Sequence, residues 1–322
     1  MKNETMKTVL KTLNGVQSSL LLWGDPFNKD VNECIICVTG NPGLVDFYSE
    51  FGQELHNELT MPVCVIGQAG HEEISVKTTS ENLTSDSNSF ILNGQIAHKH
   101  DLISNYISKQ SKLHLIGHSI GGWQIIELID RNPELVSRIS SVNLLFPTIQ
   151  KMAESPNGRF LNLFLRRIHW LLLIFLKLLR ILPYWINSYL IYLYLSWHSL
   201  PSHYYERIAK VIDPNVMEKV LILAFDEMDT VTNLNKDAIK NIKHLTNVIY
   251  SKTDNWAPLA YIDDLKIYEP QICLVEMEVS HAFVLKSSKL VAEKAARFIK
   301  DKRKSNLRNG DKMLNQDCEK SK

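Results

Sequence analysis

The chain has 322 residues and a mass of 37.0 kDa, which is enough for one large domain or two small ones. Apolar residues make up 45% and charged residues 22%, which excludes a wholly disordered or fibrous chain. Lysine plus arginine (36) nearly balance aspartate plus glutamate (35), so the net charge of +1 gives no reason to expect a nucleic-acid binder.

Short apolar runs alternate with longer amphipathic runs, which is typical of a mostly parallel β-sheet flanked by helices in an α/β fold. Residues 17–23 could supply an antiparallel edge strand at the start. The other expected strands are rich in Val, Ile, Leu or Cys, as strands buried on both faces should be: 35–39, 63–66, 113–116, 141–146, 247–251 and 272–277. The expected helices are 45–59, 94–108, 120–131, 235–244 and 289–300.

One domain is expected over residues 1–304, with an insertion at about 147–246 where the alternation breaks. Residues 305–322 are charged and lack an apolar run, so they are expected to form a disordered tail. Cys34 and Cys37 have the spacing of a redox motif, but they lie in a strand-like run that points their side chains to opposite faces. A metal or redox role is therefore disfavoured.

The strongest local signal is the pentapeptide Gly117-His118-Ser119-Ile120-Gly121, between an expected strand and an expected helix. A serine there lies on a tight turn, where side chains in place of the two glycines would clash. We expect the Ser119 hydroxyl to stand above the sheet and the Ile120 backbone N–H to face developing negative charge. The alternative is a serine that merely begins a helix.

A serine hydroxyl becomes a nucleophile only when a base takes its proton and an acid orients that base. On this architecture the expected chain order is serine, then aspartate or glutamate, then histidine. The histidines after Ser119 are His169, His198, His203, His244 and His281. His281 follows the last expected strand, so it is the predicted base, with a surface-loop histidine as the alternative. The others fall in the insertion or on a charged helix face.

The acid should lie at the end of the preceding strand. Asp254 occupies the loop after the expected strand 247–251, and we predict it as the partner of His281. The competing carboxylates are Asp226, Asp229, Asp263 and Asp264. The first two have no base within one strand of them, and the last two begin an exposed helix or turn.

A second oxyanion donor should come from the loop after an earlier strand. Gly40-Asn41-Pro42-Gly43 follows the expected strand 35–39, and its glycines allow the backbone to approach a substrate closely. The Asn41 backbone N–H is the predicted donor. A simple Pro-Gly turn is the alternative.

Several blocks of sequence carry a family resemblance. They are Gly117–Gly121, Asp254, His281-Ala282-Phe283, Gly40–Gly43, Asp46-Phe47-Tyr48, Ala69-Gly70-His71, 92–99, 144–148 and 154–159. Together they resemble the α/β-hydrolase superfamily and, within it, the lipid droplet-associated hydrolases. The resemblance spans roughly residues 35–300. It implies a serine esterase-like protein on lipid droplets and endoplasmic reticulum, associated with sterol-ester or acylglycerol turnover.

Residues 160–200 are strongly apolar but unsuited to cross a bilayer, because Arg166, Arg167, Lys177 and Arg180 interrupt the first part and Pro183 breaks the second. The 41 residues hold four cations, no anions, three of the six tryptophans and four of the eleven tyrosines. Arg166, Lys177 and Arg180 should share one stripe of a helix.

Snorkelling cations and amphipathic aromatics are typical of a segment that lies in a lipid interface. The expected lipid contacts are Arg166, Trp170, Phe175, Lys177, Arg180 and Trp185. The alternative is a cap that packs its apolar face on the core, and the two interpretations are compatible.

The residues therefore predict a serine hydrolase that needs no metal or organic cofactor, and the resemblance implies lipid esters as its substrates. Attack by Asp, as in epoxide hydrolases and dehalogenases, is disfavoured because Ser119 stands at the nucleophile position. The rival hypothesis is a droplet-binding scaffold with low turnover. Residues 1–22 lack the pattern of a secretory signal. The resemblance implies lipid droplets and endoplasmic reticulum, so the expected location is their cytosolic face.

Overall fold

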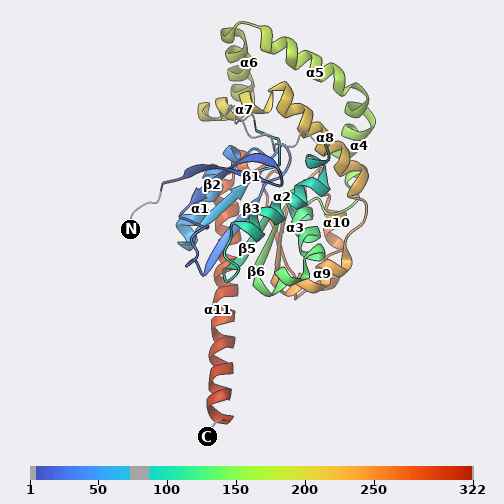
Figure 1. The fold of residues 1–322 in the computed structure, drawn as a ribbon. Coiled ribbons are helices and arrows are strands. Elements are labelled where there is room, and N and C mark those ends of the chain that lie inside the picture. The colour runs from blue at the N-terminus through green and yellow to red at the C-terminus, as the bar shows by residue number, and fades with distance from the viewer. Residues whose placement is uncertain (1–4, 73–86, 321–322) are drawn as a thin grey trace.

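The structure, a computed structural model, describes residues 5–72 and 87–320, with side chains described as far as Ser305. Within these ranges eight strands form one sheet in the order β1-β2-β4-β3-β5-β6-β7-β8 (Figure 1). The strands are β1 (Lys7–Leu13), β2 (Val16–Trp23), β3 (Glu33–Val38), β4 (Val63–Ile66), β5 (Lys112–His118), β6 (Ile139–Leu145), β7 (Thr246–Tyr250) and β8 (Cys273–Glu276).

The sheet is mostly parallel, as predicted. Strands β3 to β8 run parallel, whereas β1 pairs antiparallel with β2 and β2 pairs antiparallel with β4. The prediction that residues 17–23 form the edge is wrong, because β1 lies outside β2. Asn14 and Gly15 join the two strands with φ of 47° and 75°, the left-handed pair that a two-residue hairpin turn requires. The Asn-Gly pair is the sequence signal for a hairpin that includes β1, a strand that the sequence analysis did not predict.

Helices cover both faces of the sheet and enclose two apolar cores. Helices α1 (Ser49–Leu59) and α11 (Ser288–Lys320) pack on the face that buries Ile35 and Cys37. The opposite face, which buries Cys34 and Ile36, is covered by α2 (Leu92–Asn105), α3 (Ile120–Arg131), α9 (Lys236–Ile242) and α10 (Leu259–Asp263).

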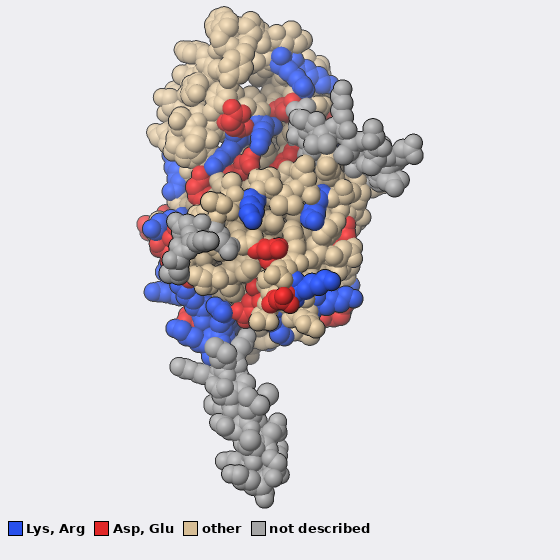
Figure 2. All heavy atoms as spheres, turned by 60° about the vertical axis from the view of Figure 1, so that its left-hand side comes forward, with Lys and Arg blue, Asp and Glu red and all other residues tan. Residues whose placement is uncertain are grey.

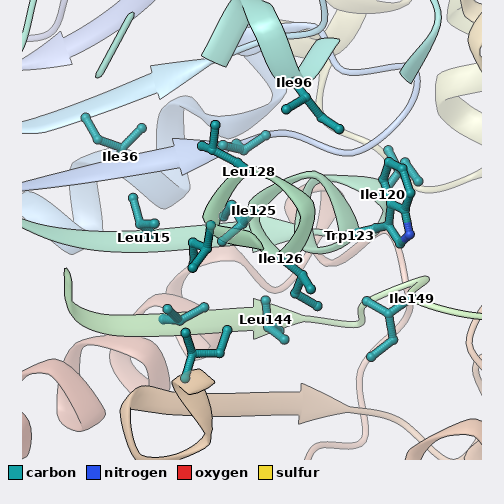
Figure 3. Packing of buried hydrophobic residues seen from close by; sticks show 14 of the residues in the cluster. Ile36, Ile96, Leu115, Ile120, Trp123, Ile125, Ile126, Leu128, Leu144 and Ile149 are labelled. Atoms are coloured by element: carbon teal, nitrogen blue, oxygen red, sulfur yellow. The ribbon is translucent and has the colours of Figure 1, made fainter. Parts of the chain in front are cut away.

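Helix α3 is the element that follows the predicted serine turn. Figure 3 shows its Ile125 and Ile126 close to Leu115 of β5 and Leu144 of β6. Burying an aliphatic side chain of this size stabilises a fold by roughly 1.5–3 kcal/mol. The packing of these side chains therefore fixes the position of α3, and with it the preceding turn, on the sheet.

The chain between β6 and α9 rises above the carboxyl ends of the strands and forms a cap. It contains α4 (Pro156–Phe160), a π-helical turn (Leu161–Leu165), α5 (Arg166–Ile181), α6 (Tyr184–Trp197), α7 (Tyr205–Val211) and α8 (Pro214–Thr230). Within the cap, residues 160–200, which we call the arch, lie farthest from the sheet (Figure 1). The insertion expected at 147–246 also includes α9, but Ile239 and Ile242 of that helix belong to the core of the sheet.

The C-terminal segment differs from its expectation. Residues 305–322 were expected to be disordered, yet α11 continues as helix to Lys320 and projects from the body (Figure 1). Charge without an apolar run does not by itself prevent a helix, although this segment also contains Gly, Asn, Asp and Ser, which have low helix propensity.

Candidate active site

Ser119 lies at a sharp turn between β5 and α3. Its backbone has φ of 53° and ψ of −123°, a strained conformation for a residue other than glycine. A Cβ atom on Gly117 would lie 2.6 Å from the Gly121 carbonyl oxygen, and one on Gly121 would lie 2.5 Å from the Val38 carbonyl oxygen. Both glycines are thus required by close approach of backbone, as the motif predicts.

The structure brings the three predicted residues together at the carboxyl ends of their strands. His281 Nε2 lies 2.9 Å from Ser119 Oγ, and His281 Nδ1 lies 2.7 Å from Asp254 Oδ2. In this arrangement a neutral imidazole donates from Nδ1 to the carboxylate and can accept the serine proton at Nε2.

The competing carboxylates bind elsewhere. Asp226 accepts a hydrogen bond from the Leu92 backbone and Asp264 accepts one from Gln150. Asp229 pairs with Arg166, and Asp263 pairs with Lys266. None of these four hydrogen bonds or ion pairs involves His281.

Asp254 is held in one orientation. Its side chain is 1% exposed, and Oδ1 accepts hydrogen bonds from the backbone N–H groups of Trp256 (2.7 Å) and Ala257 (3.1 Å). Burial alone would raise the pKa of this carboxyl, but His281 and the two amides lower it below its usual value. Asp254 is therefore a carboxylate at neutral pH.

Two further residues, which the sequence analysis missed, support the His281 loop. His118 Nε2 lies 2.9 Å from the His281 carbonyl oxygen, which can only accept, so Nε2 carries the proton of the neutral ring. The other ring nitrogen, Nδ1, therefore accepts a hydrogen bond from the Tyr48 hydroxyl at 2.6 Å. The same hydroxyl accepts the Gly40 N–H at 2.8 Å. Burial lowers the pKa of His118 to about 3, which keeps this ring neutral. The available signal was the place of His118 beside Ser119 in the motif.

The two predicted oxyanion donors lie beside the serine. The Ile120 N–H is at the first turn of α3, where backbone donors lack a partner within the helix. Gly40 approaches so closely that an added Cβ would lie 3.1 Å from Ser119 Cβ. Among the hydrogen bonds of the described residues, the Asn41 N–H finds no acceptor. The role of both N–H groups as oxyanion donors stays a prediction.

A cavity of about 360 Å³ opens onto Ser119 and His281. Its walls are mostly apolar and include Leu161, Leu165 and Leu172 from the inner side of the arch. In the residues that the structure describes, no group of three His, Cys, Asp or Glu side chains could hold a metal ion. The arrangement is suited to bind an apolar acyl group next to a serine nucleophile.

Glu227 of α8 also lines this cavity and was missed by the sequence analysis. It is 1% exposed and accepts a hydrogen bond from Asn41 Nδ2 at 3.0 Å. The signal was its helical spacing from Leu223 and Ala224, which places a carboxyl on the buried face of α8. Burial raises the pKa of Glu227 to about 8, so it is protonated at neutral pH.

This raised pKa predicts a pH-dependent stability difference. The unfolded chain ionises Glu227 near pH 4.5 and the folded chain near pH 8, so wild type loses stability as the pH rises between these values. We expect Glu227→Gln to gain a few degrees in Tm relative to wild type on going from pH 5 to pH 9, measured by differential scanning fluorimetry. Exposed Glu134→Gln is the matched control. A difference that stays constant with pH would contradict the prediction.

The outer side of the arch is unusually apolar and exposed. Trp170 and Phe175 are 53% and 54% exposed, and Trp185 is 71% exposed. In the view of Figure 2 the top of the molecule is mostly free of charged side chains, and most of the charged side chains lie lower down. No helix in the described ranges is both long enough and apolar enough to cross a membrane. Exposed apolar surface of this extent marks an interaction site.

The predicted cationic stripe is only partly free. Arg166 binds Asp229 of α8 through both guanidinium nitrogens, and Arg180 Nη1 lies 3.2 Å from Asp213 Oδ2. Lys177 is exposed. The two arginines therefore join the arch to α8, and their role in lipid contact stays a prediction.

The fold resembles those of solved structures. A bacterial membrane phospholipase A superposes with a TM-score of 0.60 at 15% identity, covering 94% of this chain and 88% of that chain. At this identity the likeness shows the fold alone. With its mostly parallel sheet and strand–serine–helix turn, the chain has the predicted α/β-hydrolase fold.

Sequence relatives define the family. Residues 31–284 match the family described as Lipid-droplet associated hydrolase. A "Lipid droplet-associated hydrolase" of Drosophila melanogaster is 36% identical over 89% of this chain and 96% of its own length. The protein of the same name from Homo sapiens is 32% identical over 87% of this chain and 89% of its own length. The chain belongs to the lipid droplet-associated hydrolase family.

Proposed function

We propose that this protein is a serine esterase that hydrolyses lipid esters at the surface of lipid droplets through an acyl-enzyme on Ser119. The observation that carries the proposal is the Ser119–His281–Asp254 chain of hydrogen bonds, 2.9 and 2.7 Å long, at the floor of a mostly apolar cavity. The names of the relatives, which pair a hydrolase with lipid droplets, support the same assignment.

In the first half-reaction Ser119 Oγ attacks the ester carbonyl carbon while its proton passes to His281 Nε2. Asp254 stabilises the imidazolium that forms. The carbonyl oxygen becomes an oxyanion and accepts hydrogen bonds from the Ile120 and Asn41 N–H groups. The tetrahedral intermediate then collapses, and His281 gives its proton to the leaving alcohol.

In the second half-reaction water attacks the acyl-enzyme. His281 takes a proton from this water, and the same two N–H groups stabilise the second oxyanion. Collapse breaks the bond to Ser119 Oγ, which recovers its proton from His281, and the fatty acid leaves. The proposed substrate is thus a carboxylic ester. The family resemblance of the sequence suggests sterol esters or acylglycerols as the class of ester.

The arch would place this site at the lipid surface. Its inner leucines line the cavity, while its outer tryptophans and tyrosines are exposed. Amphipathic aromatic side chains are favoured at the boundary of acyl chains and headgroups. The inner side of the arch would thus cap the cavity while its outer side binds lipid. The proposed location is the cytosolic surface of lipid droplets and endoplasmic reticulum.

The test is a panel of cholesteryl, triacylglycerol, monoacylglycerol and p-nitrophenyl esters given to purified wild type and Ser119→Ala, together with a fluorophosphonate probe. We expect wild type to be labelled and to release fatty acid. Ser119→Ala should do neither, because the nucleophile is gone. Thermal melting checks that the variant is folded.

A droplet-binding scaffold with low turnover is the second candidate, because the exposed apolar arch could bind lipid whether or not Ser119 reacts. Folded wild type that binds droplets but neither labels nor hydrolyses any ester of the panel would favour the scaffold and contradict the esterase.

A further inference from the structure

The Asn41 side chain connects residues Gly40–Gly43, which we call the oxyanion loop, to the cap. Asn41 Nδ2 donates to Glu227 Oε1 at 3.0 Å and to the Val220 carbonyl oxygen at 3.1 Å. Val220 and Glu227 are two turns apart on α8, so one amide group joins the loop to one face of this helix.

Other contacts fix the two sides of the loop but leave the Asn41 side chain to α8. Gln68 Nε2 donates to the Thr39 carbonyl oxygen at 2.7 Å, and Gly40 N donates to Tyr48. On the far side, His71 Nδ1 lies 2.6 Å from the Pro42 carbonyl oxygen. Within the described residues, Glu227 supplies the side-chain acceptor for Asn41 Nδ2.

We propose that Glu227 is a positioning residue for ester hydrolysis: by accepting the hydrogen bond from Asn41 Nδ2, its carboxyl group fixes the Asn41 backbone N–H toward the developing oxyanion. The inference rests on the function proposed above. It assigns to a cap residue a share in the transition-state stabilisation of the Ser119 reaction.

The protonation of Glu227 fits this role. A carboxylate in the cavity would repel the oxyanion that forms at Ser119, whereas a neutral carboxyl group still offers its carbonyl oxygen to Asn41. Burial keeps the group protonated at neutral pH, since its pKa is raised to about 8. Glu227 thus accepts the hydrogen bond from Asn41 without placing a negative charge beside the reaction.

The experiment compares Glu227→Met, which keeps the size but removes the acceptor, with Glu227→Gln, which keeps a carbonyl acceptor. The kcat and KM for p-nitrophenyl butyrate are measured at pH 7 on the full chain. We expect Glu227→Met to lower kcat at least tenfold with KM within about twofold, because oxyanion stabilisation acts in the transition state. Glu227→Gln should restore kcat to within about threefold of wild type.

A second variant serves if Glu227→Met does not fold. Asn41→Ala keeps the backbone donor but loses the side-chain amide that binds Glu227, so it should lower kcat at least tenfold with KM little changed. A kcat of folded Asn41→Ala within twofold of wild type would contradict the positioning role.

Three results would overturn the inference. They are a kcat of folded Glu227→Met within twofold of wild type, an effect confined to KM, or a Gln variant as slow as the Met variant. The rate of wild type against Ser119→Ala tests the esterase function separately, so an unchanged Glu227 variant of an active enzyme refutes the positioning role alone.

Discussion

Asp254→Asn should lower kcat for a soluble ester by about 10³- to 10⁴-fold at pH 7. The Trp256 and Ala257 N–H groups both point at Oδ1 of Asp254, and they would hold the oxygen of the new amide in that place. The amide nitrogen must then face His281 Nδ1 and donate to it. The imidazole would carry its proton on Nε2 and could no longer accept the proton of Ser119.

The measurement is kcat for p-nitrophenyl butyrate, with Asp263→Asn as the matched control. Asp263 is an exposed carboxylate that pairs with Lys266, so its variant should keep wild-type activity. Thermal melting verifies the fold of both. A kcat of Asp254→Asn within tenfold of wild type would show that Asp254 does not orient the base.

Sequence reasoning reached these residues because the chemistry follows the local pattern. In a parallel sheet all strands end at the same edge, so a residue on each strand-end loop can be placed without knowing the packing. Ser119, Asp254 and His281 each follow a predicted strand by three or four residues. Their convergence is thus a consequence of strand order and direction.

Glu227 could not be placed in the same way. It meets Asn41 across 186 residues of chain, and the contact depends on how α8 lies over the oxyanion loop. Helical spacing predicts that Glu227 is buried but not against what. His118 likewise follows from the motif, while its bond to the His281 carbonyl depends on the path of a loop.

The cap shows the same division between pattern and packing. Composition predicted the apolar, aromatic character of residues 160–200, and spacing predicted that Arg166 and Arg180 share a side of one helix. Only the packed structure reveals that Asp229 of α8 and Asp213, the N-cap residue of α8, pair with them. Arg166 and Arg180, which look free to reach headgroups in the sequence, form ion pairs within the cap.

The exposed aromatic and aliphatic side chains of the arch therefore should provide most of the affinity for a lipid surface. We expect the triple variant Ile181→Glu, Trp185→Glu and Trp197→Glu to bind triolein–phospholipid droplets at least 100-fold more weakly than wild type. These side chains are 79%, 71% and 84% exposed, so their replacement leaves the core intact. Losing even about 1 kcal/mol per side chain gives this factor, and full burial of such a side chain stabilises by roughly 1.5–3 kcal/mol.

Flotation of purified protein with droplets measures the binding, and fractionation of cells repeats it. Point substitutions are sharper than deletion of the arch, because deletion would also remove Leu161, Leu165 and Leu172 from the cavity. Ile267→Glu is the matched control, since Ile267 is 72% exposed but lies outside the arch. The triple variant should keep wild-type kcat on p-nitrophenyl butyrate, which needs no lipid surface. Equal flotation of the triple variant and wild type would contradict the interfacial role of the arch and leave it as an internal cap.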